Sequence, residues 1–345
     1  RDPQNWQHNI SVNGGSDKIS YLNMLGYHDE DGSYKTVKYK KYNFRSDITA
    51  KITNRFKIRF DISGNQRDDR RFYWPSDNVE NFTIPDFYRQ TFCQSRLYPF
   101  YTDVQGNPVT HRTDYPVISG SWNPVEMVLG NRYWKTKKRT LDGQIRFDLD
   151  LGQYVKGLST SFMAQYTAYD MNRKALITFN KGYRFQSASS TNPFIPAAPN
   201  ENNMTYHNLS SDYEGIREYA QFTSEYQLNW FLNYNNTFGK HKVSGVLLYE
   251  QEKYNGKAFN GRAQNMLTSS IDQIFVTSSD ATMRDFTGNE DESARESWVG
   301  RFNYSYADKY IAEFSFRDDG NYKFAPGHRW GFFPSFSLGW NVSHE

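Results

Sequence analysis

The sequence predicts an all-β chain that forms part of a transmembrane, antiparallel, up-and-down β-barrel. Three observations predict this fold. Apolar and polar residues alternate with period two in long windows, aromatic residues make up 17% of the 345 residues, and the segments between the windows alternate between short and long. Period-two alternation is typical of a strand with one apolar and one polar face.

The composition excludes several other classes of protein. No stretch approaches the roughly 18 apolar residues that a membrane helix needs. A chain so rich in Phe, Tyr and Trp is not expected to be disordered. The net charge is only +3, so we expect no nucleic-acid partner. The single cysteine, Cys93, excludes an intramolecular disulfide framework and a cysteine-based metal cluster.

The alternation predicts the strands in chain order. Residues 56–63 and 144–151 alternate without a break, and 226–235 and 298–306 follow the same pattern. No comparably convincing amphipathic helix is found. About eleven strands are expected, near 6–13, 18–27, 39–53, 56–64, 137–151, 157–171, 220–238, 242–256, 295–306, 310–318 and 329–342.

The connections between these strands fall into two classes that alternate strictly. The short ones lie at 14–17, 53–55, 152–156, 238–241 and 307–309, and the long ones at about 28–38, 65–136, 172–219, 257–294 and 319–328. Alternate turns of a meander lie at the same end of the sheet. Outer-membrane barrels have short turns at one rim and long loops at the other. A soluble β-sandwich or propeller is the alternative, but long structureless loops are uncommon in compact soluble domains.

The two faces of the strands predict what each face contacts. In a membrane barrel the apolar face meets lipid and the polar face lines the lumen. Bacterial single-chain barrels have an even number of strands, so eleven strands indicate part of a larger barrel. The charged residues expected to face the lumen are Lys57, Arg59, Asp61, Arg146, Asp148 and Asp150.

A motif near the C-terminus resembles a known family. Residues 316–340 read FRDDGNYKFAPGHRWGFFPSFSLGW. This run is similar to the barrel signature of the SusC/RagA family of TonB-linked outer-membrane transporters of Bacteroidetes. Stretches at 8–18, 25–27 and 42–46 also resemble that family, whereas the long loops do not. The motif residues are Asp319, Gly320, Pro326, Gly327, Arg329, Trp330, Gly331, Pro334 and Trp340.

The motif also has local structural implications. Asp319-Gly320 and Pro326-Gly327 are pairs of turn-forming residues. Pro334 cannot donate a backbone hydrogen bond, so we expect a bulge or a local break in the strand there.

The resemblance implies a location in the bacterial outer membrane, a complete barrel of about 22 strands, and TonB-driven import of oligomeric nutrients. It also implies a SusD-like surface lipoprotein as a partner on the long-loop side. Residues 1–345 would be part of the barrel domain, and the plug domain and TonB box would lie outside this chain. Glycans are the favoured cargo, and oligopeptides, as for a RagA-like transporter, are the alternative.

Aromatic residues in the first very long loop are candidates for contact with cargo or a partner. Aromatic faces beside charged groups bind sugars and peptides through stacking and cation–π contacts. The alternative is that so long a loop needs aromatic residues for a small core of its own. The candidates are Tyr73, Trp74, Tyr98, Tyr101, Trp122 and Trp134.

We expect no catalytic residue, no metal site and no cofactor. The seven histidines are scattered, and no nucleophile elbow or phosphate-binding glycine loop occurs. Three other functions stay open: a passive porin, an outer-membrane enzyme such as a protease or lipase, and a soluble carbohydrate-binding β-domain.

Overall fold

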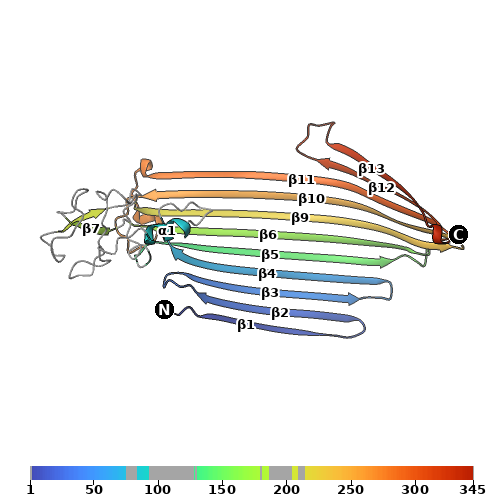
Figure 1. Ribbon diagram of the computed structural model, residues 1–345, viewed down its shortest axis with the longest axis horizontal. Helices are drawn as coiled ribbons and strands as arrows, with labels where there is room; N and C mark the ends of the chain where they lie inside the picture. Colours follow the sequence, from blue (N-terminus) through green and yellow to red (C-terminus); the bar gives the residue numbers. More distant parts are fainter. Residues whose placement is uncertain are drawn as a thin grey trace.

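The computed structural model describes residues 2–74, 84–92, 128, 130–178, 181–185, 204–208 and 214–344. Among these residues, eleven strands form one antiparallel sheet (Figure 1). In sheet order they are β1 (Asn5–Gly15), β2 (Ile19–Asp31), β3 (Lys38–Lys51), β4 (Phe56–Phe72), β5 (Tyr133–Asp150), β6 (Leu158–Ile177), β9 (Gly215–Phe238), β10 (His241–Gln264), β11 (Arg284–Tyr306), β12 (Tyr310–Asn321) and β13 (Trp330–Trp340).

Smaller elements lie in the connections. Helix α1 (Ile84–Phe92) follows β4, and a separate hairpin of β7 (Lys181–Phe185) and β8 (Met204–Asn208) lies between β6 and β9. Three short 3₁₀ helices, η1 (Ile274–Val276), η2 (Ala281–Met283) and η3 (Val342–His344), complete the described elements. Because each strand of the main sheet pairs with the next one, the predicted up-and-down meander of eleven strands is confirmed.

The three longest connections lie at one end of the sheet, as predicted, but the long connection expected at 28–38 is wrong: residues 32–37 between β2 and β3 are fewer than residues 151–157 in the turn after β5. The turns after β1, β3, β5, β9 and β11 lie together at the right-hand end of the sheet in Figure 1. The connections after β4, β6 and β10 lie at the opposite end, beside α1 and β7. The two ends of the sheet are therefore different surfaces, one of tight turns and one of long loops.

Several strands are longer than predicted. Strands β9 and β10 have 24 residues each, and β4 extends to Phe72 rather than to residue 64. Strand β11 begins at Arg284, eleven residues before the expected start at 295. The sequence signal stops early because alternation of apolar with polar residues depends on contact with lipid, whereas the backbone ladder continues beyond the bilayer with polar residues on both faces.

One face of the sheet, which we call the apolar face, carries a continuous hydrophobic band. Residues directly opposite each other in an antiparallel pair share a face, and Phe60 lies opposite both Ile48 and Ile145. At about 3.4 Å per residue, the positions from Phe56 to Gly64 span about 27 Å of strand, which matches a membrane band of about 25 Å once the strand tilts. In β4 and β5 the band consists of Phe56, Ile58, Phe60, Ile62, Gly64, Leu149, Phe147, Ile145, Gly143 and Leu141.

The band shifts along the register from strand to strand. It ends at Gly64 in β4 and at Tyr249 in β10. When the pairing is followed from β10 through β9, β6 and β5 to β4, Tyr249 lies in the same cross-strand row as Ile58. Ile58 lies three apolar-face positions before Gly64 in β4, so the band ends in a different row in each of the two strands. Strands tilted relative to a barrel axis produce this stagger, because a level band must cross tilted strands at successive heights.

The buried side chains gather at the long-loop end. One cluster joins Phe72, Trp74 and Phe87 of α1 with Val128. Two others flank it and contain Tyr73, Trp134, Ala175 and Ile177, and Tyr133, Leu176 and Ile216. The middle of the sheet has no core of its own, since one face of a barrel wall meets lipid and the other meets the lumen.

Helices do not cross a membrane in the described parts of the chain, since none there is long and apolar enough to do so.

Candidate functional site

The face opposite the hydrophobic band, which we call the polar face, carries a compact ionic cluster on β4, β5 and β6. The Asp148 carboxylate accepts hydrogen bonds from Arg146 Nε at 2.8 Å and from Arg59 Nη2 at 3.0 Å. The Ser161 hydroxyl donates to the same carboxylate at 2.8 Å. One carboxylate thus orders two guanidinium groups from neighbouring strands, and the remaining N–H donors can bind a polar solute.

A second ionic cluster lies on β10, β11 and β12. Asp319 Oδ1 accepts from Arg317 Nε and from the Ser297 hydroxyl, each at 2.6 Å. Arg295 Nη2 contacts Glu252 Oε2 at 2.5 Å, and Arg317 Nη2 lies 3.5 Å from Glu250 Oε1.

Sequence reasoning missed most of this cluster. The signal was the i, i+2 spacing of Glu250 with Glu252 and of Arg317 with Asp319, which places each pair on one strand face.

Amide side chains occupy the polar face on the strands between the two clusters. Gln144, Gln165 and Gln227 occupy one continuous cross-strand row on the polar face. Gln227 Nε2 donates to Glu250 Oε2 at 3.2 Å, which joins the row to the second cluster. The polar face therefore presents donors and acceptors across at least six strands.

The six residues predicted to face the lumen all lie on the polar face. Lys57 is opposite Asp148 in the register, and Asp61 is opposite Gln144, whose Nε2 lies 3.5 Å from Asp61 Oδ2. The Asp150 carboxylate instead accepts from the backbone N–H of Gly152 at 2.7 Å, so it stabilises the tight turn after β5.

Three of the six candidate loop aromatics are packed into the clusters at the loop end. Tyr73, Trp74 and Trp134 are buried, and Trp134 is only 1% exposed. The rings of Tyr73 and Trp134 lie 5.7 Å apart, and the guanidinium groups of Arg71 and Arg173 each lie 5.7 Å from the Trp134 ring. This burial supports the alternative that these rings build a core. Tyr98, Tyr101 and Trp122 lie outside the described residues.

The motif residues show two departures from expectation. Asp319 and Gly320 do not form a turn; they lie in β12, and the turn follows between Asn321 and Trp330. A Cβ on Gly320 would meet the Trp330 ring at 2.9 Å, so glycine is required because the ring covers the backbone. In the turn itself, Gly327 has a φ of +85°, which favours glycine.

The break expected at Pro334 is wrong. Pro334 pairs with Phe316 within an unbroken register. Strand β13 is the outermost strand of the described sheet, and a proline whose nitrogen points away from β12 removes no hydrogen bond from the ladder between these two strands. Arg329 Nε donates to the carbonyl of Phe324 at 3.1 Å and so holds the Pro326-Gly327 turn in place.

An ionic contact fastens the β10–β11 connection to the end of the sheet. The Tyr133 hydroxyl donates to the Asp272 carboxylate, and Lys135 Nζ lies 3.5 Å from it. The hydrogen bond from Tyr133, together with Lys174 and Lys135, lowers the pKa of Asp272. Burial and the bond to Asp272 raise the pKa of Tyr133.

Metal-binding chemistry finds no support among the described residues: no group of three or more His, Cys, Asp or Glu side chains there could hold a metal ion.

Comparison with known proteins finds relatives along nearly the whole chain. No protein-family model matches. TonB-dependent receptor P26 of Formosa agariphila is 21% identical and aligns with 97% of this chain and 30% of its own length. TonB-dependent receptor SusC of Bacteroides thetaiotaomicron is 20% identical and aligns with 98% of this chain and 31% of its own length. The chain thus spans about a third of the length of these relatives.

Solved structures show the same fold. The RagAB peptide transporter superposes with a TM-score of 0.70 at 17% identity, over 98% of this chain and 34% of that chain. The meander, the apolar band and the two unlike ends define this chain as wall of an outer-membrane β-barrel. Among such barrels it is similar to the TonB-dependent receptors of the SusC/RagA type, as the motif at 316–340 predicted. The named relatives are receptors and a transporter rather than enzymes.

Proposed function

We propose that this chain forms part of the barrel wall and the extracellular rim of a TonB-dependent transporter that imports oligomeric nutrients across the outer membrane. The observation that carries the proposal is the contrast between the two faces of one eleven-stranded meander. The apolar face can contact lipid, and the polar face, with its two ionic clusters, can line a wet path.

Energy coupling and the lid require parts that we place outside these residues. The polypeptide would include a plug domain with a TonB box, and residues 1–345 would belong to the barrel domain. A SusD-like lipoprotein would cover the long-loop end. The similarity to SusC, whose name describes a TonB-dependent receptor, and to the RagAB transporter supports the coupling to TonB. The lipoprotein is proposed from the family resemblance of residues 316–340.

The residues of the polar face are proposed to contact cargo as it passes through the lumen, and none of them is proposed to act in catalysis. Arg59, Arg146 and Asp148 would line the lumen together with Lys57, Asp61 and Asp150. Charged groups that are already paired with each other bind a passing solute weakly, so cargo can enter and leave. Tyr98, Tyr101 and Trp122 are proposed contacts for cargo or lid, and Tyr73, Trp74 and Trp134 would support the loop that carries them.

Glycans are the proposed cargo, with oligopeptides as the alternative. The name of the RagAB transporter describes a peptide importer, whereas the SusC name states no cargo. Stacking aromatics suit sugar rings and hydrophobic peptide side chains alike.

A growth experiment tests the function and separates the cargoes. A strain lacking the gene is grown on single oligosaccharides and, separately, on oligopeptides as the limiting nutrient. We expect loss of growth on one class, rescue by the intact gene, and no rescue in a strain without TonB. Growth restored without TonB would instead indicate a passive porin. Absence of a co-purifying lipoprotein would contradict the lid.

A further inference from the structure

Three basic side chains lie directly opposite one another on the polar face of neighbouring strands. Lys41 of β3 pairs with Arg67 of β4, and Arg67 pairs with Lys138 of β5. Residues directly opposite in an antiparallel ladder have Cβ atoms about 5 Å apart, and like charges in such positions destabilise a sheet. We call these three residues the basic row.

The basic row lies just beyond the membrane band, on the side of the long loops. Phe44, Gly64 and Leu141 lie at the end of the band and form a row of their own across the same three strands. Each member of the basic row lies three residues nearer the long loops, which is about 10 Å along the strand. The three cations therefore face the lumen where a solute from outside would enter it.

The surroundings of the basic row differ from those of other cations on the polar face. No hydrogen bond or ion pair joins Lys41, Arg67 or Lys138 to another residue that the structure describes. Elsewhere on this face, six arginine side chains each lie within 3.0 Å of a carboxylate, namely Arg45, Arg59, Arg146, Arg295, Arg301 and Arg317. The sheet thus pairs its other lumen-facing arginines and places three like charges side by side at the entrance.

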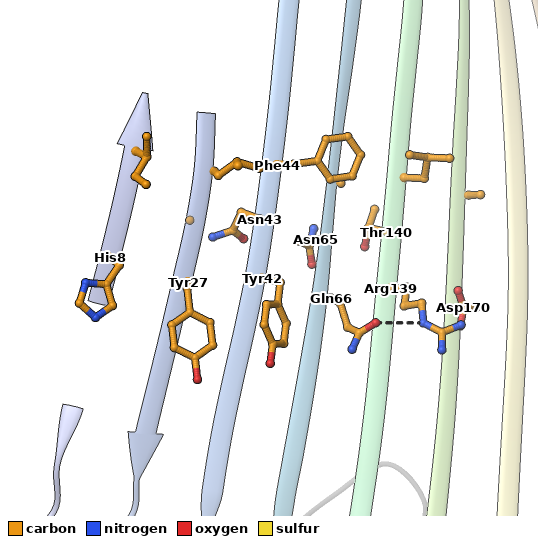
Figure 2. Close-up of a pocket in the computed structure, with 16 residues that line it drawn as sticks. His8, Tyr27, Tyr42, Asn43, Phe44, Asn65, Gln66, Arg139, Thr140 and Asp170 are labelled. Carbon is orange, nitrogen blue, oxygen red and sulfur yellow. Dashed lines mark hydrogen bonds and ion pairs between the residues drawn. The ribbon is translucent and has the colours of Figure 1, made fainter. Parts of the chain in front are cut away.

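Cations on the apolar face at this height have partners. Figure 2 shows Arg139 of β5 between Gln66 and Asp170; Arg139 Nε lies 3.3 Å from Gln66 Oε1, and Nη1 lies 3.5 Å from Asp170 Oδ2. Lys40 on the same face lies 3.1 Å from Asp29. The positive charge of the outer surface is therefore offset locally, whereas that of the lumen surface is not.

Two acidic side chains, Glu30 and Asp69, lie in the next row toward the long loops, on either side of Tyr39. Glu30 lies 3.8 Å from His28, and Asp69 interacts electrostatically with Lys138, Arg67 and Arg173. Among the described residues beyond the band, the polar face of β2–β6 carries five basic and two acidic side chains, namely Lys41, Arg67, Arg71, Lys138 and Arg173 with Glu30 and Asp69. An anionic ligand would thus meet a local excess of positive charge.

Neutral hydrogen-bonding groups lie beside the basic row. Asn43, Asn65 and Thr140 form the polar-face row between it and the end of the band, and their amides and hydroxyl can bind sugar hydroxyls. Neighbouring strands are about 4.8 Å apart, whereas side chains on one side of an extended peptide recur only every 7 Å or about that. The close spacing favours an acidic oligosaccharide over an acidic peptide, because every ring carries hydroxyls and can carry an anionic group.

We propose that the basic row captures an acidic oligosaccharide, with carboxylate or sulfate groups on its rings, as this cargo enters the lumen. The inference rests on the proposed function, since it assigns a chemical class to the cargo of the same lumen. Arg67 can bind a carboxylate or sulfate through two N–H groups, and Lys41 and Lys138 add a point charge on either side. The paired clusters further along the lumen bind the same anionic groups weakly, so the cargo can leave the row.

Growth on nutrients sorted by charge tests the class of cargo. The deletion strain, with and without the intact gene, receives neutral oligosaccharides, oligouronates, sulfated oligosaccharides or acidic oligopeptides as the limiting nutrient. We expect the gene to be required on at least one acidic oligosaccharide and on none of the neutral ones. A requirement only on neutral sugars or on peptides would overturn the inference and leave the transporter standing. No requirement on any nutrient would contradict the transporter as well.

Substitutions in the basic row test the residues. The complete protein, purified in detergent, is titrated with the acidic oligosaccharide that the growth experiment identifies and with the same compound after its carboxylates are reduced or its sulfates removed. Arg67→Gln with Lys138→Gln is expected to weaken binding of the acidic form about tenfold, or about 1.4 kcal/mol for two exposed ion pairs, and to leave binding of the neutral form unchanged. Arg67→Lys with Lys138→Arg keeps both charges and is expected to bind the acidic form nearly as well as the unaltered protein.

The matched control is Lys253→Gln with Lys257→Gln, which removes the same charge from the apolar face of β10. We expect it to bind the acidic form like the unaltered protein, and equal losses in both double variants would overturn the proposal. The urea midpoint of unfolding gives a second readout. Because the basic row holds like charges together, Arg67→Gln with Lys138→Gln should leave the midpoint unchanged or raise it. A lower midpoint, or an equal loss of binding for the neutral form, would mean that the row holds another part of the protein instead of cargo.

Discussion

Three glycines on the apolar face, Gly64, Gly245 and Gly300, are each covered by an aromatic ring from the neighbouring strand. A Cβ at Gly64 would meet the ring of Phe44, one at Gly300 would meet Phe316, and one at Gly245 would meet Phe302 at 2.9 Å. A ring lying over a glycine covers exposed backbone and fixes the register of the two strands. Composition alone cannot show this pairing, because the glycine and its ring can be far apart in the chain. Gly245 and Phe302, for example, are separated by 57 residues.

We therefore expect Gly300→Ala to destabilise the barrel by about 1–3 kcal/mol, because the Phe316 ring must move. Gly143→Ala is the matched control. It lies on the same face, and a Cβ there would meet nothing within 4 Å. Denaturant-induced unfolding from lipid vesicles measures both. Similar stability of the two variants would contradict the role assigned to the ring.

The contact between Tyr133 and Asp272 predicts a pH dependence. The folded-state pKa of Asp272 is lowered, so its stabilising contribution is present above the unfolded value of about 3.9. That contribution is lost as the pH falls through the lowered value. The β10–β11 connection should thus loosen in acid while the strands remain paired.

Asp272→Asn is expected to loosen the same connection at neutral pH. The change removes the charge that Lys135 and Lys174 face, and it weakens the bond from Tyr133. Hydrogen exchange of residues 265–283 measures the effect, with the amides of β5 as the internal reference. Unchanged exchange in the variant would contradict the contact.

At the scale of the element, the period-two pattern predicts that adjacent residues of one strand differ in how much a charged substitution destabilises the barrel. Ile145 lies in the middle of the β5 band, and Gln144 points to the opposite face. An arginine on the lipid face near the bilayer centre costs about 2–4 kcal/mol, whereas one on the lumen face costs little. Ile145→Arg should therefore destabilise the barrel far more than Gln144→Arg.

Folding into vesicles at increasing urea concentration compares these two variants. Equal costs would mean that β5 does not separate lipid from lumen. The reverse order would mean that the apolar face points inward.

Strand ends show where sequence reasoning fails at this scale. Alternation predicted β4 to residue 64, yet the strand continues through Arg67, Asp68 and Arg70 to Phe72. These residues pair with β3 and β5 in an unbroken ladder. Beyond the bilayer both faces of the strand meet water, so polar residues occur on both faces. The sequence of such a segment cannot be distinguished from the sequence of a polar loop.

At the scale of the whole molecule, the described sheet has two outer edges, one at β1 and one at β13. A bilayer requires every backbone group to be paired, and only a closed sheet provides this. We therefore expect residues 1–345 expressed alone to associate through these edges rather than to fold as a monomer. The longer polypeptide expected by similarity to SusC should fold in vesicles and resist unfolding in cold detergent.

Electrophoretic mobility with and without heating measures this difference. A heat-sensitive monomer of 40.5 kDa formed by the 345 residues alone would contradict the prediction. Hydrogen exchange at β1 and β13 in the longer polypeptide provides a second readout, because closure should protect both edges.

The sequence by itself determined the class of fold, the number of strands in the main sheet, the end of the sheet at which the longest connections lie, and the family resemblance carried by residues 316–340. It could do so because a bilayer imposes a local rule, apolar at every second residue, that no distant contact can override. The tertiary structure alone decided which residues meet. It buried Trp74 and Trp134 and kept Asp319 and Gly320 in a strand. These features depend on the cross-strand register, which joins residues far apart in the chain and leaves no local pattern.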